Sequence, residues 1–406
     1  MSRLRYAFWL AAALWSAWLL SLWLGQGYLD LAGQPIGTDF LQFYAAGRTL
    51  LMGESARLYD FAFQAEVERA IIGPGLTSYH AFITPPLLAW LFVPLAALPY
   101  PLSFALWSLA GLAALGMSVW MLAPQGFSWR RLGWTLTFFP VFASISFGQN
   151  SLLSLALLSL TYFLWLREKK FAAGLVLSLL LYKPQLAVGI AGLWLWNWRR
   201  DYRALLGLGL GAGLGAALSW LTLTEASLAY LRFAREVLPN LPAWQDFPIW
   251  HLHTLRGFWR LLLPMPLADE LWLMGILLGL GVWGATLRRV HDPARRFAAA
   301  VLLTLWVTPH AMIYDWSLLL IPALLVWEAC PLSRSALLPA YTALWLASLL
   351  SGPLTYLQWQ TWHRAVQLSL PTFVWAVLKG GRAAFTADEP ATSVGHTTSS
   401  RPHPSQ

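Results

Sequence analysis

The sequence has little charge and almost no cysteine. Asp, Glu, Lys and Arg make up only 11% of its 406 residues, whereas 58% are hydrophobic. A soluble globular protein of this length needs far more polar surface, so the composition predicts an integral membrane protein. The single cysteine, Cys330, excludes an intrachain disulfide and a cysteine-based metal site. The sequence also contains no phosphate-binding loop, no glycine-rich dinucleotide fingerprint and no nucleophile elbow.

The basic residues indicate membrane topology. The net charge is +9, but Lys and Arg cluster at the ends of apolar runs. These clusters are Arg3 with Arg5, Arg167 with Lys169 and Lys170, Arg199 with Arg200 and Arg203, and residues 288–296. Such a distribution follows the positive-inside rule and does not suggest a nucleic-acid partner. Arg3 and Arg5 place the N-terminus in the cytoplasm, so the chain emerges on the other side after residue 24.

Many apolar runs predict an all-α polytopic membrane protein. The candidate spans are residues 6–24, 84–98, 102–122, 132–147, 151–166, 171–182, 184–196, 204–223, 271–287, 297–308, 313–327, 336–350 and 362–378. Several are shorter than the roughly 20 residues that cross a bilayer. We therefore expect about 10–13 transmembrane helices, some short or re-entrant, in one membrane domain over residues 1–380. Residues 381–406 are rich in Thr, Ser, Pro and His, which predicts a disordered cytoplasmic tail.

Two positions in this arrangement are open to more than one interpretation. The first is residues 171–196, which have basic clusters at both ends. This pattern predicts two short helices that meet at Lys183-Pro184 and line a wet pocket. The alternative is a single span with a kink at Pro184. The second is the loop with Arg130 and Arg131. If every candidate span from residue 6 onward crosses the membrane, these two arginines lie outside the cytoplasm. Either residues 84–98, which contain Pro94, are re-entrant, or this loop violates the charge rule.

Two outer loops, at about residues 25–83 and 224–270, are long enough to fold. In the first, apolar residues recur at helical spacing and Gly53 ends the run, which predicts an amphipathic helix on the membrane. Its apolar positions are Phe40, Phe43, Tyr44, Gly47, Leu50 and Leu51. Asp39 would lie at the start of this helix, where a carboxylate often serves only as an N-cap.

A few polar residues are candidates for chemistry because ionisable groups inside a membrane protein are costly. Lys183 needs an anion, either a lipid phosphate or a structural carboxylate such as Asp315. His310 could donate to a phosphate or satisfy a helix end. The amides of Gln149 and Asn150 could bind hydroxyls or cap the next helix.

The second outer loop carries a predicted basic face. His253, Arg256 and Arg260 are three and four residues apart, so a helix would place them on one side, above anionic lipid headgroups or a lipid phosphate. His251 and His253 lack the spacing and the acidic partner of a zinc motif. We therefore predict no metal site.

The order of several short motifs resembles glycosyltransferase family 87, which belongs to the C-type superfamily and includes polyprenol-phosphate-mannose-dependent mannosyltransferases. The motifs are Gly37-Thr38-Asp39-Phe40, Tyr44-Ala45-Ala46-Gly47, Leu58-Tyr59-Asp60, Pro85-Pro86, Pro94-Leu95, Trp107, Gly148-Gln149-Asn150, Ala173-Gly174, Tyr182-Lys183-Pro184-Gln185 and Tyr314-Asp315. The resemblance extends over about residues 6–350. The family's Tyr-Pro-Pro pattern appears here as Thr84-Pro85-Pro86, so no aromatic role is expected at Thr84.

The resemblance implies a C-type fold and an enzyme of the bacterial cytoplasmic membrane that works on the outer face. It would transfer a hexose, by default mannose, from a polyprenyl-phosphate sugar to a lipid or glycan acceptor with inversion, without a metal or cofactor. Asp39 would be the general base. The residues that would bind the donor phosphate are Lys183, Arg256 and His310, and those that would bind substrate are Tyr44, Gln149, Asn150, Gln185 and Asp315.

Two other functions remain possible at this point. A transporter or flippase of lipid-linked sugars would also need broken helices, a wet pocket and cations at depth. A membrane scaffold without catalytic activity would explain the spans but leaves the ordered polar residues unexplained.

Overall fold

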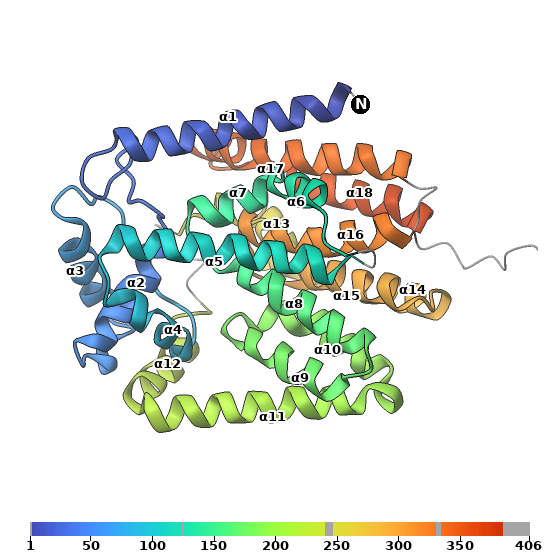
Figure 1. The fold of residues 1–406 in the computed structure, drawn as a ribbon, viewed down its shortest axis with the longest axis horizontal. Coiled ribbons are helices and arrows are strands. Elements are labelled where there is room, and N and C mark those ends of the chain that lie inside the picture. The colour runs from blue at the N-terminus through green and yellow to red at the C-terminus, as the bar shows by residue number, and fades with distance from the viewer. Residues whose placement is uncertain (1, 124–125, 240–246, 330–333, 385–406) are drawn as a thin grey trace, which may run out of the picture.

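The computed structural model describes residues 2–123, 126–239, 247–329 and 334–384, and these residues form helices and connecting segments without a β-strand (Figure 1). The α-helices are α1 (Ser2–Leu24), α2 (Phe40–Leu51), α3 (Phe61–Ile72), α4 (Pro86–Ala96), α5 (Tyr100–Met121), α6 (Trp129–Leu136), α7 (Phe139–Ser146), α8 (Ser151–Leu166), α9 (Lys170–Ser178), α10 (Val188–Trp196), α11 (Trp198–Thr222), α12 (Thr224–Glu236), α13 (Leu255–Arg260), α14 (Met265–Arg289), α15 (Pro293–Val307), α16 (Leu320–Ala329), α17 (Arg334–Trp362) and α18 (Ser369–Ala384). Short 3₁₀ helices are η1 (Ser55–Arg57), η2 (Leu179–Tyr182), η3 (Pro184–Ala187), η5 (Ile249–His251) and η6 (Ile313–Leu319).

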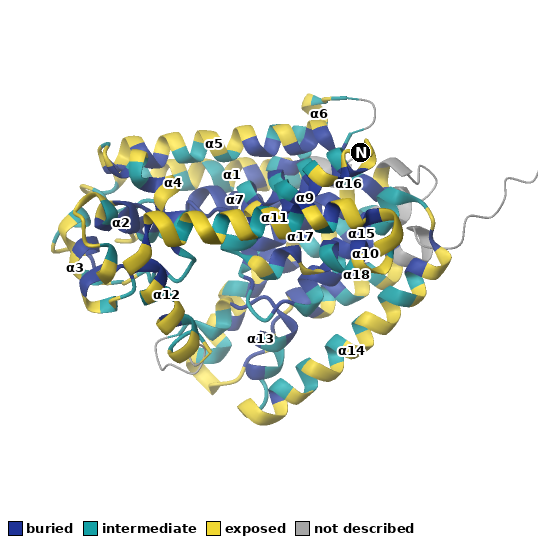
Figure 2. Ribbon diagram, turned by 90° about the horizontal axis from the view of Figure 1, so that it is seen from below, coloured by how far each residue is buried: buried dark blue, intermediate teal, exposed yellow. Residues whose placement is uncertain are grey.

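Four of the described helices are long and apolar enough to cross a membrane. They are Tyr6–Leu24, Tyr100–Met121, Trp198–Thr222 and Met265–Arg289. Only 11% of the best window in α11 and in α14 is buried inside the protein, and Figure 2 shows their exposed faces along the outside of the molecule. Exposed leucine faces of this length need lipid around them. The all-α polytopic membrane fold predicted from the sequence is confirmed, and many of the predicted spans are short helices.

One end of the bundle gathers the basic clusters, and we call it the basic end. The Lys170 ammonium donates to the Arg200 carbonyl oxygen at 3.1 Å, and the Arg296 guanidinium donates to Asn197 Oδ1 at 3.1 Å. These contacts bring together the start of α9, the end of α10 and the start of α15. The opposite end, which carries α2, α3, α4 and α12, is the loop end (Figure 1).

Residues 170–196 form a hairpin and not one kinked span. Lys170 begins α9 and contacts Arg200, which lies just after α10, so both ends of the segment are at the basic end. The break falls at Lys183-Pro184, between η2 and η3. Proline has no N–H for a helical hydrogen bond and disfavours helical backbone in the residue before it. The predicted pair of short helices is therefore present.

Helix α4 is too short to span a bilayer by itself, which bears on the position of Arg130 and Arg131. It has 11 residues and packs against α2 at the loop end. Helix α5 starts there, since the Tyr100 hydroxyl donates to the Ile36 carbonyl oxygen, and it leads to α6 at the other end. The α6 ring of Trp134 lies 4.9 Å from Phe8 of α1. Arg130 and Arg131 thus lie at the end where the chain begins, as the charge rule requires.

Helix α2 confirms the helix predicted in the first loop, but the chain buries most of it. Phe40, Phe43, Tyr44 and Gly47 are buried, and Gly53 ends the run with a φ of 77°. A Cβ on Gly47 would lie 2.7 Å from the Phe92 carbonyl oxygen, so glycine permits the close approach of α4. Helix α2 is consequently an internal element under α4.

The C-terminal region departs from the prediction at one point. Helix α17 ends at Trp362 and α18 continues to Ala384, so residues 381–384, assigned to the tail, are helical. The backbone between these helices turns at His363, which has a φ of 49°. Residues 385–406, the rest of the predicted disordered tail, lie outside the described residues.

Helices α9 and α11 approach closely through glycine, which makes a testable prediction. A Cβ on Gly207 would lie 2.1 Å from the Phe171 carbonyl oxygen, whereas a Cβ on Gly213 of the same helix meets nothing within 4 Å. We expect Gly207→Ala to cost about 1–3 kcal/mol of stability through overpacking. Gly213→Ala should be neutral or slightly stabilising, because Ala favours a helix by about 1 kcal/mol over Gly. Thermal unfolding in detergent measures both, and equal melting temperatures would contradict the prediction.

Candidate active site

Asp39 lies between a glycine turn and the first turn of α2. Gly37 has a φ of 64°, and a Cβ there would lie 2.3 Å from the Phe104 ring, so only glycine fits. The Phe40 N–H donates to the Phe147 carbonyl oxygen at 2.9 Å, which fixes the start of α2 against the segment between α7 and α8. The Asp39 side chain makes no capping hydrogen bond to α2 and is 21% exposed. The carboxylate is thus partly open, and N-capping does not explain it.

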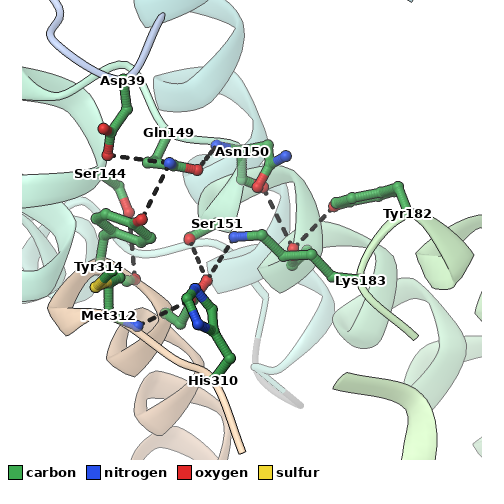
Figure 3. A network of polar contacts seen from close by, with 12 residues as sticks. Asp39, Ser144, Gln149, Asn150, Ser151, Tyr182, Lys183, His310, Met312 and Tyr314 are labelled. Carbon is green, nitrogen blue, oxygen red and sulfur yellow. Dashed lines mark hydrogen bonds and ion pairs between the residues drawn. The ribbon is translucent and has the colours of Figure 1, made fainter. Parts of the chain in front are cut away.

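The Asp39 carboxylate is held by side chains from distant parts of the chain (Figure 3). The Gln149 amide donates to Asp39 Oδ2 at 3.0 Å and to the Tyr314 hydroxyl at 3.1 Å. On the other side, His80 Nδ1 lies 3.8 Å from Asp39 Oδ1. One oxygen therefore has an amide donor and the other faces an imidazole.

A buried ion pair lies beside this group. Lys183 Nζ donates to Asp315 Oδ1 at 2.8 Å, and the Ser151 hydroxyl donates to the same oxygen at 2.7 Å. The backbone N–H of Met312 donates to Asp315 Oδ2 at 3.2 Å. The side chains of Lys183 and Asp315 are only 13% and 4% exposed. Of the two sequence-based interpretations of Lys183, this structure shows the pairing with a structural carboxylate.

Three helical hairpins assemble these residues. The segment between α7 and α8 carries Gln149 and Ser151, and the break between α9 and α10 carries Lys183. Residues 308–315, between α15 and α16, carry Tyr314 and Asp315. The Ser144 hydroxyl of α7 donates to the Tyr314 carbonyl oxygen at 3.3 Å and ties two of the hairpins together. Each hairpin leaves the α-helical conformation at its tip, and Figure 3 shows the side chains of the three tips gathered below Asp39.

A model of the family Glycosyltransferase family 87 matches residues 82–313, more than half of the chain. The chain belongs to glycosyltransferase family 87. Comparison with curated proteins and with solved structures gives no match. As a member of this family, the protein is a membrane glycosyltransferase. The matched region contains Gln149 and Lys183 but neither Asp39 nor Asp315. The evidence that these two acids belong to the same site is their hydrogen bonds to Gln149 and Lys183.

The basic face predicted in the second outer loop of this glycosyltransferase does not form. Arg256 and Arg260 each make two hydrogen bonds to Asp269, at 2.8–3.0 Å. His253 is 1% exposed and its Nδ1 lies 2.8 Å from the Ser369 hydroxyl. Of the three residues, Arg256 and Arg260 lie in a helix, because α13 begins at Leu255 after its N-cap Thr254. Because an acid from α14 and a hydroxyl from α18 lie against these side chains, they are not a free cationic surface.

Two further residues predicted to bind the donor phosphate, His310 and Arg256, lie in different places. His310 lies beside the Lys183–Asp315 pair (Figure 3). Arg256 is held at Asp269, and the hydrogen bonds described for Asp39 do not include it. Its role as a donor-phosphate ligand, like that of His310, stays a prediction.

The predicted substrate-binding residues differ in how close they lie to Asp39. The Tyr44 hydroxyl donates to the Leu98 carbonyl oxygen at 2.7 Å, which is a packing role. Asn150 is fully buried, and its side chain neither caps α8 nor has a hydrogen-bond partner within the described structure. Gln185 is partly buried in η3, two residues from Lys183. Of this group, Gln149 contacts Asp39 directly.

Sequence reasoning missed His80 and His251. His80 is the one histidine of the first outer loop, residues 25–83, and its presence in the same loop as Asp39 was the available signal. His251 comes from the second loop. The surrounding protein lowers the pKa of His251 below its usual value, and the charge of Asp39 opposes this shift. The geometric contact with the Asp39 carboxylate comes from His80 alone of these two histidines.

The site offers no ready set of metal ligands. Within residues 2–123, 126–239, 247–329 and 334–384, no three His, Cys, Asp or Glu side chains lie close enough together to hold a metal ion. The cations and hydrogen-bond donors named above are the groups that can meet a negatively charged substrate.

Proposed function

We propose that this glycosyltransferase moves a hexose, by default mannose, from a polyprenyl-phosphate sugar to a lipid or glycan acceptor, with inversion and with Asp39 as general base. The observation that supports it most strongly is the Asp39 carboxylate, which is partly open and lies against the tips of broken membrane hairpins. A site at this place suits a donor that resides in the membrane.

The chemistry needs a base and a way to handle a phosphate. Asp39 would take the proton of the acceptor hydroxyl as its oxygen attacks the anomeric carbon, while the bond between that carbon and the lipid phosphate breaks. Gln149 fixes one carboxylate oxygen through the bond at 3.0 Å and leaves the other for the acceptor. The departing phosphate would meet hydrogen-bond donors, with Lys183 and His310 at the hairpin tips and Arg256 of α13 as candidates.

The proposed location follows from the charge distribution. The basic end would face the cytoplasm, so the loop end and Asp39 would face the outside of a bacterial cytoplasmic membrane. The basic clusters serve topology in this proposal, so the partners are the donor, the acceptor and membrane lipids, with no nucleic acid and no cofactor.

Purified protein in nanodiscs tests the donor class directly. We expect labelled sugar to pass from a synthetic polyprenyl-phosphate mannose to acceptors in a bacterial lipid extract, and not from a nucleotide-activated mannose. The stereochemistry of the product reports inversion. If no polyprenyl-phosphate hexose is consumed, while vesicles containing the protein move such lipids between leaflets, the transferase proposal is wrong and a flippase is indicated.

A further inference from the structure

Two buried polar side chains of α3 hold a short irregular segment, residues 78–82, next to Asp39. Gln64 Oε1 accepts hydrogen bonds from the Tyr79 hydroxyl at 2.8 Å and from the Phe82 N–H at 2.9 Å. Glu68 Oε2 accepts the His80 N–H at 3.1 Å. Gln64 and Glu68 are only 4% and 1% exposed. Burying a carboxylate is costly, and here burial raises the pKa of Glu68 to about 7. Both buried groups fix one stretch of backbone.

That stretch holds the His80 ring between Ser78 and Asp39. His80 Nε2 lies 3.1 Å from the Ser78 hydroxyl, and Nδ1 lies 3.8 Å from Asp39 Oδ1. The bond that one ring nitrogen makes decides which nitrogen carries the proton in a neutral imidazole. When Nε2–H donates to Ser78, the unprotonated Nδ1 faces the Asp39 oxygen that Gln149 leaves unbonded. In that tautomer the ring is oriented to accept a proton from Asp39.

We propose that His80 receives the proton that Asp39 takes from the acceptor hydroxyl, and that Ser78, Gln64 and Glu68 position it for this step. The inference rests on the proposed function. The Oδ1–H bond of Asp39 breaks, an Nδ1–H bond forms on His80, and Asp39 is again a carboxylate; the imidazolium then loses its proton to water. An imidazole nitrogen is a stronger base than a carboxylate oxygen, so the transfer is downhill. The 3.8 Å separation closes with a small ring movement or one bridging water.

His80 acts on the reaction through Asp39 and is a positioning and proton-accepting residue. The titratable groups around it are Asp39, Glu68 and Tyr79, and the charge of Asp39 also acts on His251 of the other loop. Glu68 ionises in the same pH range as an imidazole. The pH experiment is therefore made in a Glu68→Gln background, which keeps an oxygen for the His80 N–H and removes the second titration.

The first test is rescue by imidazole. We expect His80→Ala to lower kcat by about tenfold to a hundredfold, with little change in KM. A group that transfers a proton directly contributes about a hundredfold or more. Added imidazole should restore part of the rate, in proportion to its unprotonated fraction. His291→Ala is the matched control, because His291 is an exposed histidine just after α14. A His80→Ala enzyme that is folded, slowed and indifferent to imidazole would overturn the proposal.

The second test is the pH profile, which does not require the alanine variant to fold. Glu68→Gln enzyme should lose kcat as the pH falls, because an imidazolium cannot accept a proton. In Glu68→Gln/His80→Gln the acid limb of the profile should move to lower pH, because the imidazole is gone and glutamine does not titrate. An unmoved acid limb would contradict the role of His80. Asp39→Asn separates the two proposals: if it is inactive while every His80 variant behaves like wild type, Asp39 remains the base and only the His80 inference fails.

Discussion

We expect Asp39→Asn to lower sugar transfer by about 10² to 10⁴, the usual contribution of a positioned acid or base. An asparagine side chain cannot take a proton from the acceptor, although it can still meet the Gln149 amide through its own oxygen. The fold should be preserved, because Asp39 makes no capping hydrogen bond to α2. Its stability should therefore stay within about 0.5 kcal/mol of wild type. Initial rates with a polyprenyl-phosphate sugar, together with thermal unfolding in detergent, measure both effects.

Asp60→Asn is the matched control for this experiment. Asp60 lies in the same outer loop and caps α3 by accepting from the Phe63 N–H at 3.2 Å. Asparagine caps a helix as well as aspartate does, and the exposed Arg57–Asp60 ion pair contributes little. This variant should transfer sugar at nearly the wild-type rate. An Asp39→Asn enzyme that retains more than about a tenth of the activity would rule out Asp39 as the base, since even a weak base contributes more than that.

The second large effect is expected at the buried pair of Lys183 and Asp315. Lys183→Met leaves the Asp315 carboxylate with only the Ser151 and Met312 donors, and Asp315→Asn leaves a buried ammonium unpaired. Removing one partner of a buried ion pair typically costs about 3–5 kcal/mol. Each single variant should therefore unfold at a much lower temperature, and Lys183→Met/Asp315→Asn should recover part of the loss.

Activity of the double variant distinguishes the two interpretations of Lys183. If its charge only balances Asp315, the double variant should regain transfer as it regains stability. If the ammonium also meets the donor phosphate, the protein should be stable and still slow, with a raised KM for the donor. Single variants as stable as wild type would contradict the buried pair itself.

Some of this architecture is predictable because it is local. The break at Lys183-Pro184 follows from a residue that cannot continue a helix, and basic clusters on both sides fix the direction of the hairpin. Helix α2 follows from the spacing of Phe40, Phe43, Tyr44 and Gly47 and from Gly53 after it. These features depend on backbone chemistry within a few residues.

Other features depend on contacts between distant segments. The spacing of His253, Arg256 and Arg260 suggested a free basic face, but Asp269 and Ser369 from other helices lie against it. Residues 84–98 were a candidate span by hydropathy. In the structure, α4 packs on α2 through Gly47 and lies at the loop end. Spacing along the chain cannot reveal such partners.

The sequence by itself determined that this is a helical membrane protein, that its apolar segment at residues 171–196 breaks at Lys183-Pro184, and that Asp39 follows the first apolar run. Hydropathy, charge at span ends and proline act locally, so they can be read along the chain. Only the tertiary structure decided that Gln149 and His80 lie against Asp39 and that Asp315 neutralises Lys183. The Lys183–Asp315 contact joins residues 132 positions apart, and such pairs are set by how the hairpins pack, because short-range forces act only once packing has brought the groups together.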